Sequence, residues 1–380
     1  MVLEQAHWTR QNGWSGIGDK NLLDSAGLVL VFGSREELAI AERFNEVRAA
    51  YPNARIISCS TSGEILGANV WDNSITSTAI VFDDTPLTVA TLNIAEHPSS
   101  YDAGQVLVGK LLRDDLLHVF VISDGQKVNG SDLVRGMIAL LPPNISVTGG
   151  LAGDGTQFQK TLVGMDQSPT EGNIVAIGFY GTRLKIGYGS MGGWDSFGPD
   201  RVITRAEGNV LYELDGQSAL ALYKKYLGDL AAELPGSALL FPLSIRVGEG
   251  DISVVRTILS IDEESESMTF AGDMPVGAYA RLMKANFDRL IDGASIAANE
   301  TQETIGSSTS PDMAILISCV GRKVVLGQRT EEEVESVCEV LGDGTVVTGF
   351  YSYGEISPFS ASTKCELHNQ TMTITTFSEK

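Results

Sequence analysis

The sequence has 380 residues, 43% of them apolar and 20% charged, which is typical of a folded globular protein. This length predicts two domains, or one large domain built by duplication. The 48 acidic and 27 basic residues give a formal net charge of −21, and such a surface repels nucleic-acid phosphates and anionic lipid headgroups. We therefore expect no nucleic-acid partner and no membrane partner, and the charge favours small molecules or basic protein surfaces.

The cysteines and the first residues favour a cytoplasmic protein. The cysteines are scattered without a C-x-x-C pair, which matches neither a disulfide framework nor a structural zinc site: they are Cys59, Cys319, Cys338 and Cys365. The N-terminal sequence lacks the basic and apolar regions of a signal peptide. No apolar run approaches the roughly 18 residues that a membrane span requires.

An apolar run at 28–32 predicts a buried strand and begins the first of three similar units. Ser34, with Glu37 three residues later, forms a capping pattern that starts a helix. A second strand at 55–58 follows the helix and leads into C-S-T-S-G-E-I at 59–65.

The same order of elements occurs twice more. In the second copy it comprises a strand at 119–122, a helix at about 132–141, a strand at 145–148 and G-G-L-A-G-D at 149–154. In the third copy it comprises a strand at 314–318, a helix start at 330–333, a strand at 345–348 and F-Y-S-Y-G-E-I at 350–356. Each copy then continues into a further apolar strand.

The repeat predicts an α/β fold with mixed sheets built from strand–helix–strand units. Such a crossover places two parallel strands in one sheet, and the strand that returns through a tight glycine corner is expected to be antiparallel. We expect an N-terminal arm at 1–25 and two domains, at 26–227 and 228–380. A helix at 215–227 is expected to close the first domain.

A glycine followed by an acid recurs just past a strand in all three copies, at Gly63-Glu64, Gly153-Asp154 and Gly354-Glu355. Ligands of α/β sheets gather beyond the carboxyl ends of parallel strands. These acids either bind a ligand or cap their own corners, and capping is favoured for any single acid. The predicted ligand-binding residues are Cys59, Ser60, Thr61, Glu64, Gly153, Asp154, Tyr351, Tyr353 and Glu355.

Two other motifs do not favour catalysis or nucleotide binding. A G-x-G-x-x-G pattern ends at Gly192 but is followed by G-W-D-S-F-G-P, not by the helix that a pyrophosphate site requires. Cys59 lies at a strand end, but a nucleophilic thiol needs a base, and no histidine lies near it in its unit. We expect that the chain is not an enzyme, and a Cys59-dependent hydrolase or transferase is the least favoured reading.

Several segments resemble the FIST family, sensory proteins with a FIST N and a FIST C domain. They include I-S-C-S-T-S-G-E-I (57–65), H-V-F-V-I-S-D-G (118–125), G-G-L-A-G-D-G (149–155), S-C-V-G-R-K-V-V-L-G-Q (318–328) and G-F-Y-S-Y-G-E-I (349–356). The resemblance covers about residues 26–378. It implies a domain that senses a small ligand and passes the signal to a signalling protein. Stand-alone members of this size resemble a branch that binds haem, senses nitric oxide and regulates a partner histidine kinase.

This resemblance brings in haem as a cofactor, although no histidine pair has metal-ligand spacing. A haem iron needs only one protein ligand and leaves no spacing signature. The axial candidates are His97, in a loop before Pro98, and His118, at a strand start. The sequence-based hypothesis is thus a haem-based nitric oxide sensor that regulates a cytoplasmic histidine kinase. The alternative is a haem-free sensor of an amino acid or similar metabolite that uses the glycine–acid corners.

Overall fold

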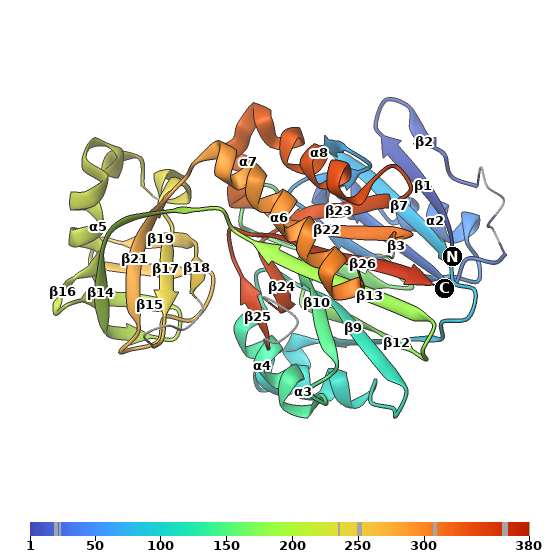
Figure 1. Cartoon of the computed structure of the whole chain (residues 1–380), viewed down its shortest axis with the longest axis horizontal. Helices are drawn as coiled ribbons and strands as arrows, with labels where there is room; N and C mark the ends of the chain where they lie inside the picture. The colour runs from blue at the N-terminus through green and yellow to red at the C-terminus, as the bar shows by residue number, and fades with distance from the viewer. Residues whose placement is uncertain are drawn as a thin grey trace.

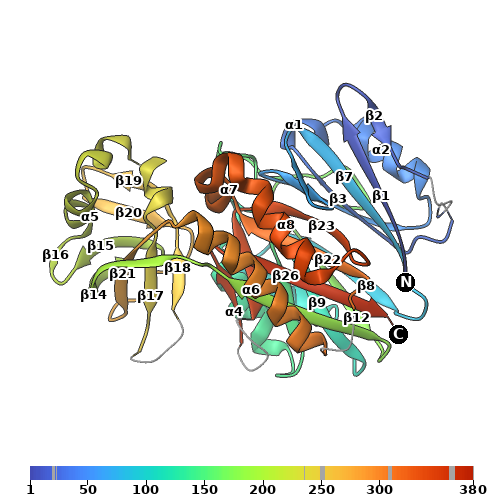
Figure 2. The same cartoon turned by 45° about the horizontal axis from the view of Figure 1, so that its top comes forward.

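The computed structural model describes residues 1–18, 22, 24–234, 236–248, 253–306, 310–358 and 364–379. They form a large body and a small β-rich domain beside it, which is yellow in Figure 1. Figure 2 shows that the small domain is attached where β14 leaves the body and where β21 returns to α6. The predicted mixed α/β fold built from repeated units is confirmed.

The body consists of three units with the same order of strands. The first unit comprises β1 (Val2–Thr9), β2 (Gly13–Ser15), β3 (Leu28–Gly33), α1 (Arg35–Leu38), α2 (Ala41–Ala50), β4 (Arg55–Ser60), β5 (Glu64–Leu66), β6 (Asn69–Trp71) and β7 (Ser74–Val81). The second comprises β8 (Leu87–Asn93), η1 (Ile94–Glu96), α3 (Ser100–Gly109), β9 (Leu116–Ser123), α4 (Gly130–Leu140), β10 (Ser146–Leu151), β11 (Val163–Met165) and β12 (Asn173–Tyr180).

The third unit comprises β13 (Leu184–Met191), α6 (Phe287–Ile305), β22 (Met313–Cys319), α7 (Val320–Leu326), η4 (Gly327–Arg329), α8 (Thr330–Leu341), β23 (Val346–Ser352), β24 (Gly354–Pro358), β25 (Cys365–His368) and β26 (Met372–Glu379). The small domain is inserted between β13 and α6 of this unit. It comprises β14 (Asp195–Glu207), β15 (Val210–Leu214), β16 (Gln217–Ser218), α5 (Ala219–Leu227), η2 (Gly228–Glu233), η3 (Gly236–Leu240), β17 (Leu243–Arg246), β18 (Val254–Arg256), β19 (Ile258–Asp262), β20 (Ser267–Phe270) and β21 (Tyr279–Lys284).

Each unit forms the centre of a six-stranded sheet that other units complete: β11 joins the first sheet, β24 and β25 the second, and β5 and β6 the third. The sheet orders are β11-β4-β3-β7-β1-β2, β25-β24-β10-β9-β12-β8 and β6-β5-β23-β22-β26-β13. In each, the central pair (β3/β4, β9/β10 or β22/β23) is parallel and the return strand is antiparallel, as predicted. The edge strands are exchanged in a cycle, since the first unit's β5 joins the third sheet, the third unit's β24 joins the second, and the second unit's β11 joins the first.

Three backbone hydrogen bonds close this cycle at the corners that follow β4, β10 and β23. The Ser62 amide donates to the Tyr351 carbonyl (2.8 Å), the Tyr353 amide to the Leu151 carbonyl (3.2 Å), and the Gly153 amide to the Ser60 carbonyl (2.9 Å). Each unit therefore donates once and accepts once, which makes Ser62, Gly153 and Tyr353 equivalent positions. We name this feature the corner ring.

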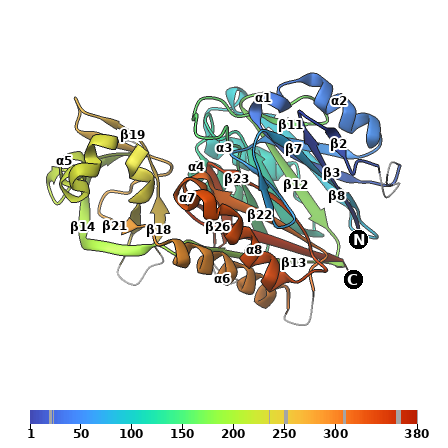
Figure 3. The same cartoon turned by 90° about the horizontal axis from the view of Figure 1, so that it is seen from above.

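The sheets bury both faces, as expected for strands with continuous apolar runs. Their inner faces share one core to which all three units contribute, with Phe32 and Cys59, Phe120 and Ile122, and Phe350 and Phe377. Separate helices cover the outer faces: α2 the first sheet, α3 and α4 the second, and α6 and α8 the third. These helices lie at three different positions around the body (Figures 1 and 3).

A buried ion pair fixes the attachment of the small domain. Arg322 pairs with Glu333 at 2.6 Å, and both side chains are fully buried. The same guanidinium donates to the carbonyls of Gly192, just before the inserted domain, and Leu290, just after it. Both connections to the small domain are therefore held by one side chain.

Two expected boundaries differ from the structure. Residues 2–9 do not form an arm outside the fold, because β1 pairs along its whole length with β7. The helix expected at 215–227 is present as α5, but it packs in the core of the small domain with Leu220, Tyr223 and Leu227. An amphipathic pattern predicts a buried face without indicating which sheet covers it, so the structural division lies near residues 193 and 287, not at 227.

Two equivalent glycines lie where no side chain fits. Gly149 and Gly349 have φ of +148° and +155°, and an added Cβ would lie 1.8 Å from the Val121 carbonyl oxygen and 1.9 Å from that of Leu316. We predict that Gly149→Ala or Gly349→Ala lowers the free energy of unfolding by on the order of 3 kcal/mol, measured by urea denaturation. Gly342→Ala is the matched control, since its φ is +81° but no atom lies within 4 Å of its added Cβ. If the control and test variants lose equal amounts of unfolding free energy, the close approach of the added Cβ to the carbonyl oxygen is not the cause of the loss.

Candidate functional site

Two of the three predicted acids cap their own corners. Glu64 accepts hydrogen bonds from Thr61 Oγ1 and Ser74 Oγ, both at 2.6 Å. Glu355 accepts the corresponding bonds from Ser352 Oγ at 2.7 Å and Thr371 Oγ1 at 3.0 Å. Both glutamates are at most 1% exposed, so they stabilise the corners and are closed to a ligand.

Burial changes the ionisation of these two carboxyls. Loss of hydration raises the pKa of Glu64 from 4.5 to about 7, against the opposing effect of the Ser74 and Thr61 hydroxyls. Desolvation likewise raises the pKa of Glu355 to about 8, although Ser352 and Thr371 lower it. Each corner is therefore built around a carboxyl that is readily protonated near neutral pH.

The third acid, Asp154, is not equivalent to the other two. The corner ring aligns Gly153 with Ser62 and Tyr353, so Asp154 takes the place of Gly63 and Gly354. The exchanged strands show the same shift. Glu64 on β5 lies opposite Phe350, and the residue in the corresponding position on β11, opposite Cys59, is Val163. The predicted alignment of three glycine–acid corners is thus wrong by one residue in the second unit.

Asp154 instead organises an extra loop at 154–162. Its carboxylate accepts from the amides of Phe158 (2.9 Å), Gln159 (3.1 Å) and Lys160 (2.9 Å) and from Arg35 Nη1 (3.0 Å). A carboxylate that accepts hydrogen bonds from several backbone N–H groups holds a loop in one conformation. This loop belongs to the second unit alone.

The loop and the third unit together form an aromatic wall. The Tyr353 hydroxyl donates to Asp154, and the Phe158 amide donates to the Tyr353 oxygen at 3.1 Å. The two rings stack with centroids 4.7 Å apart and an interplanar angle of 17°. Asp154 therefore positions both Phe158 and Tyr353.

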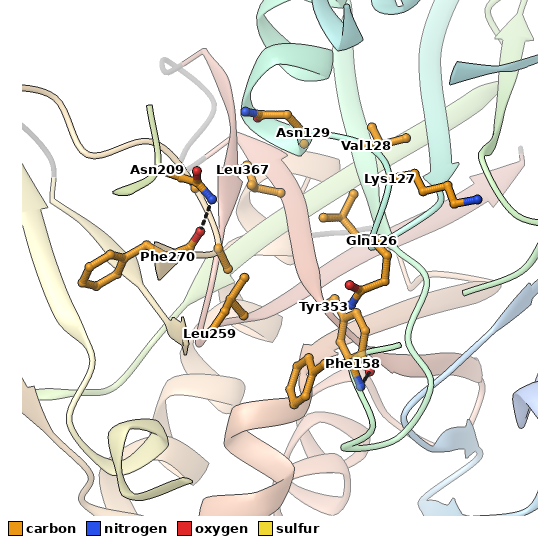
Figure 4. A pocket seen from close by; sticks show the side chains of 15 residues that line it. Gln126, Lys127, Val128, Asn129, Phe158, Asn209, Leu259, Phe270, Tyr353 and Leu367 are labelled. Carbon is orange, nitrogen blue, oxygen red and sulfur yellow. Dashed lines mark hydrogen bonds between the residues drawn. The ribbon is translucent and has the colours of Figure 1, made fainter. Parts of the chain in front are cut away.

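This wall closes one side of a pocket of about 340 Å³, which we name the strand-end pocket. Figure 4 shows Gln126 directed toward Phe158 and Tyr353, while Lys127 extends away. The Lys127 ammonium pairs with Glu171 at 3.0 Å. The pocket lies at the carboxyl ends of β9 and β10 and is completed by the small domain. Its lining comprises residues 125–130, Leu151, Phe158, Asn209, Leu259, residues 270–272, Tyr353 and Leu367.

The other predicted site residues do not line this pocket. Cys59, Ser60 and Thr61 are at most 3% exposed and pack within the corner region. An added Cβ at Gly153 would lie 2.4 Å from Ser62 Oγ, so this glycine permits the close contact between corners. Tyr351 is fully buried and donates to Glu333 at 2.9 Å, which joins it to the ion pair that holds the small domain. Tyr353 alone of the predicted residues reaches the pocket.

The structure distinguishes the two histidine candidates for a haem ligand. His118 is fully buried, and its ring nitrogens are hydrogen-bonded to Ser146 Oγ (2.8 Å) and Thr148 Oγ1 (2.9 Å), which leaves none for iron. Burial lowers its pKa to about 3, so the ring is neutral and structural. His97 follows η1 and lines neither pocket described here. Among the described residues, no group of three or more His, Cys, Asp or Glu side chains is placed to hold a metal ion.

Sequence reasoning missed most of the pocket. Gln126, Phe158 and Asn209 carry no motif, and Asn209 lies in an inserted domain whose place could not be seen from the sequence. A usable signal was present in the connection from the corner to the return strand, which is longer in the second and third copies than in the first. Extra residues in some copies of a repeat mark places where the copies differ in role.

Two protein-family models match this chain, and the boundary between them falls within the small domain, close to the expected division at 227. The FIST N domain family matches residues 27–217, and the FIST C domain family matches residues 219–358. The chain belongs to the FIST family. FIST domains are small-ligand sensing domains of signalling proteins, so the expected ligand-sensing role is confirmed at this level. In the part of the chain that the structure describes, no helix is both long and apolar enough to cross a membrane.

Other comparisons add little. No curated protein matches this sequence. A crystal structure of cyanuric acid hydrolase from A. caulinodans aligns with 78% of this FIST chain and 100% of its own, at 11% identity and a TM-score of 0.18. A TM-score this low carries no argument about fold or activity.

The two corner glutamates predict a pH-dependent stability. Because their folded pKa values lie above the ordinary 4.5, the folded state holds these protons more tightly than the unfolded state. This contribution is complete below about pH 4.5 and is lost as pH rises through 7 for Glu64 and 8 for Glu355. We predict that Glu64→Gln and Glu355→Gln each reduce the fall in unfolding free energy between pH 5 and 8.5 by on the order of 2 kcal/mol. Urea midpoints at the two pH values measure this, and a fall as steep as in the wild type would refute the assignment.

Proposed function

We propose that this FIST chain senses a small metabolite in the strand-end pocket and that occupancy of the pocket changes how the small domain lies against the body. One observation carries this proposal. The body departs from its three-unit pattern at the loop 154–162 and at the inserted small domain, and both departures line the same pocket. Sites between domains at strand ends are where small ligands commonly bind.

The chemistry of the lining favours a polar metabolite of about amino-acid size. The volume of about 340 Å³ is at the lower end of the range for ligand pockets. Gln126 offers an amide that both donates and accepts, and the stacked Phe158–Tyr353 pair offers an apolar face. A haem-free sensor of an amino acid or similar metabolite therefore suits this site, with Tyr353 as the predicted residue that contacts the ligand.

The signal is proposed to leave through a separate signalling protein, with a cytoplasmic histidine kinase as the partner. Ligand contacts with Leu259 and Gly272 on the small domain, and with Gln126 on the body, favour one placement of the two parts. Because Arg322 holds both connecting segments, we expect the small domain to rotate about Arg322 when its position relative to the body changes. The partner protein then recognises the orientation of the small domain.

The two rival functions have less support. Haem-based sensing of nitric oxide needs an imidazole that is free to bind iron. Both ring nitrogens of His118 are hydrogen-bonded, and His97 lines neither of the two pockets. Chemistry at Cys59 needs a reactive thiolate, whereas burial raises the pKa of this thiol well above its usual value. The haem-free sensor is therefore the function that we propose.

A thermal-shift screen with free amino acids and related metabolites tests the proposal. We expect one chemical class to raise Tm, and Leu259→Trp to abolish this rise because Leu259, 42% exposed, lines the pocket. Leu112→Trp is the matched control, since Leu112 is 40% exposed and lies outside the pocket. A rise that survives Leu259→Trp, or no rise with any metabolite, would contradict the proposal.

An absorption spectrum tests the haem alternative. We expect that protein incubated with haemin and passed through gel filtration carries no stoichiometric Soret band. His97→Ala is the variant to measure beside it, because His97 is the histidine candidate that is not locked between two hydroxyl groups. A stoichiometric band that responds to nitric oxide and disappears in His97→Ala would overturn the haem-free reading.

A further inference from the structure

A second pocket, of about 590 Å³, lies between α4 and the small domain, and we name it the Arg256 pocket. It shares only Leu367 with the strand-end pocket. One wall comes from Val134 and Ile138 of α4, and the facing wall comes from Ile245 and Val254 of β17 and β18. Most of the lining is therefore apolar, and it spans the interface between the body and the small domain.

Arg256 is an unusual residue to find in such a lining. It is 6% exposed, and its Nη1 donates to the carbonyls of Val255 (3.3 Å) and Leu367 (3.0 Å). Its Nε, which is buried, has no hydrogen-bond partner, and no ion pair joins the guanidinium to a carboxylate in the described ranges. Burying a cation without a direct ion-pair partner is costly: desolvation lowers the pKa of Arg256, and the Glu366 and Asp273 carboxylates oppose this effect only from beyond ion-pair distance. An anion bound in the pocket would remove this cost.

Other groups around the pocket indicate which anion fits. Ser131 Oγ, on the α4 side, is also buried without a partner. The lining carries three cations, Arg135, Arg256 and Lys364, and two carboxylates, Asp273 and Glu366. Arg135 pairs with Asp273 at 3.1 Å and also with Asp132, whereas Arg256 has no ion pair among the described residues. A single carboxylate balances the charge of Arg256 and matches the planar guanidinium. The apolar walls leave room for a hydrocarbon body.

We propose that the Arg256 pocket binds an organic monocarboxylate, whose carboxylate pairs with Arg256 and whose apolar part lies against Val134 and Ile138. Such a ligand contacts α4 and β18 together, so it holds the small domain against the body. This site is separate from the strand-end pocket, and its occupancy does not depend on the function proposed for that pocket.

The test is calorimetric titration of the full chain with 4-methylpentanoate, its uncharged amide and inorganic phosphate. We expect the carboxylate to bind at least tenfold more tightly than the amide or phosphate, and Arg256→Met to weaken it at least tenfold. Arg256→Met removes an unpaired buried charge, so it is expected to fold. Ile138→Trp, which fills the other wall, should weaken binding independently. Arg205→Met, an exposed arginine of the same domain paired with Glu213, should leave binding unchanged.

The outcomes separate this site from the strand-end pocket. Binding of 4-methylpentanoate that persists in Leu259→Trp but is lost in Arg256→Met supports the proposal, whatever the metabolite screen gives. Equal binding of carboxylate and amide, equal binding of phosphate, no detectable binding, or unchanged binding in Arg256→Met would each overturn it.

Discussion

The corner ring is the constraint on which the rest of this structure depends. Three short backbone hydrogen bonds join units that are far apart in sequence, and each unit then passes an edge strand to another unit's sheet. No unit can complete its sheet alone, so the three fold as one body around a shared core. This constraint explains why the corners contain small residues, because three segments of the chain approach one another there. Glu64 and Glu355 then supply the hydrogen bonds that the buried Thr61, Ser74, Ser352 and Thr371 hydroxyls need.

A closed symmetric arrangement leaves little room for a ligand, and the candidate sites occur where the symmetry is broken. In the second unit Asp154 begins a loop that precedes the exchanged strand β11, and this loop carries Phe158 to Tyr353. In the third unit the inserted domain is held by Arg322 and Glu333. The strand-end pocket and the Arg256 pocket both lie between this inserted domain and the second unit, and residues of the third unit complete both linings. A ligand in either pocket therefore acts on the same interface.

The local elements of the fold could be predicted from the sequence, whereas their partners could not. Apolar runs such as 28–32 and 119–122 identified strands, because this signal is local. A helix begins after Ser34 as expected, but the Ser34 hydroxyl makes no capping hydrogen bond. The exchange of β5, β11 and β24 could not be predicted, since strands of three to five residues carry too little pattern to indicate which sheet they join. The sequence of Gly153-Asp154 resembles that of Gly63-Glu64, yet the Asp154 carboxylate binds backbone amides a few residues later and shifts the register by one. Arg256 gives no sequence signal, because an arginine in a strand is ordinarily exposed or paired.

The most direct test of this account is hydrogen exchange measured by mass spectrometry, with and without the metabolite that gives the largest thermal shift. The account predicts slower exchange at 125–130, 154–160 and 257–272, which surround the strand-end pocket, and unchanged exchange at the buried corner 59–64. Protection centred on 59–64 or around His118, with none at 154–160, would contradict it.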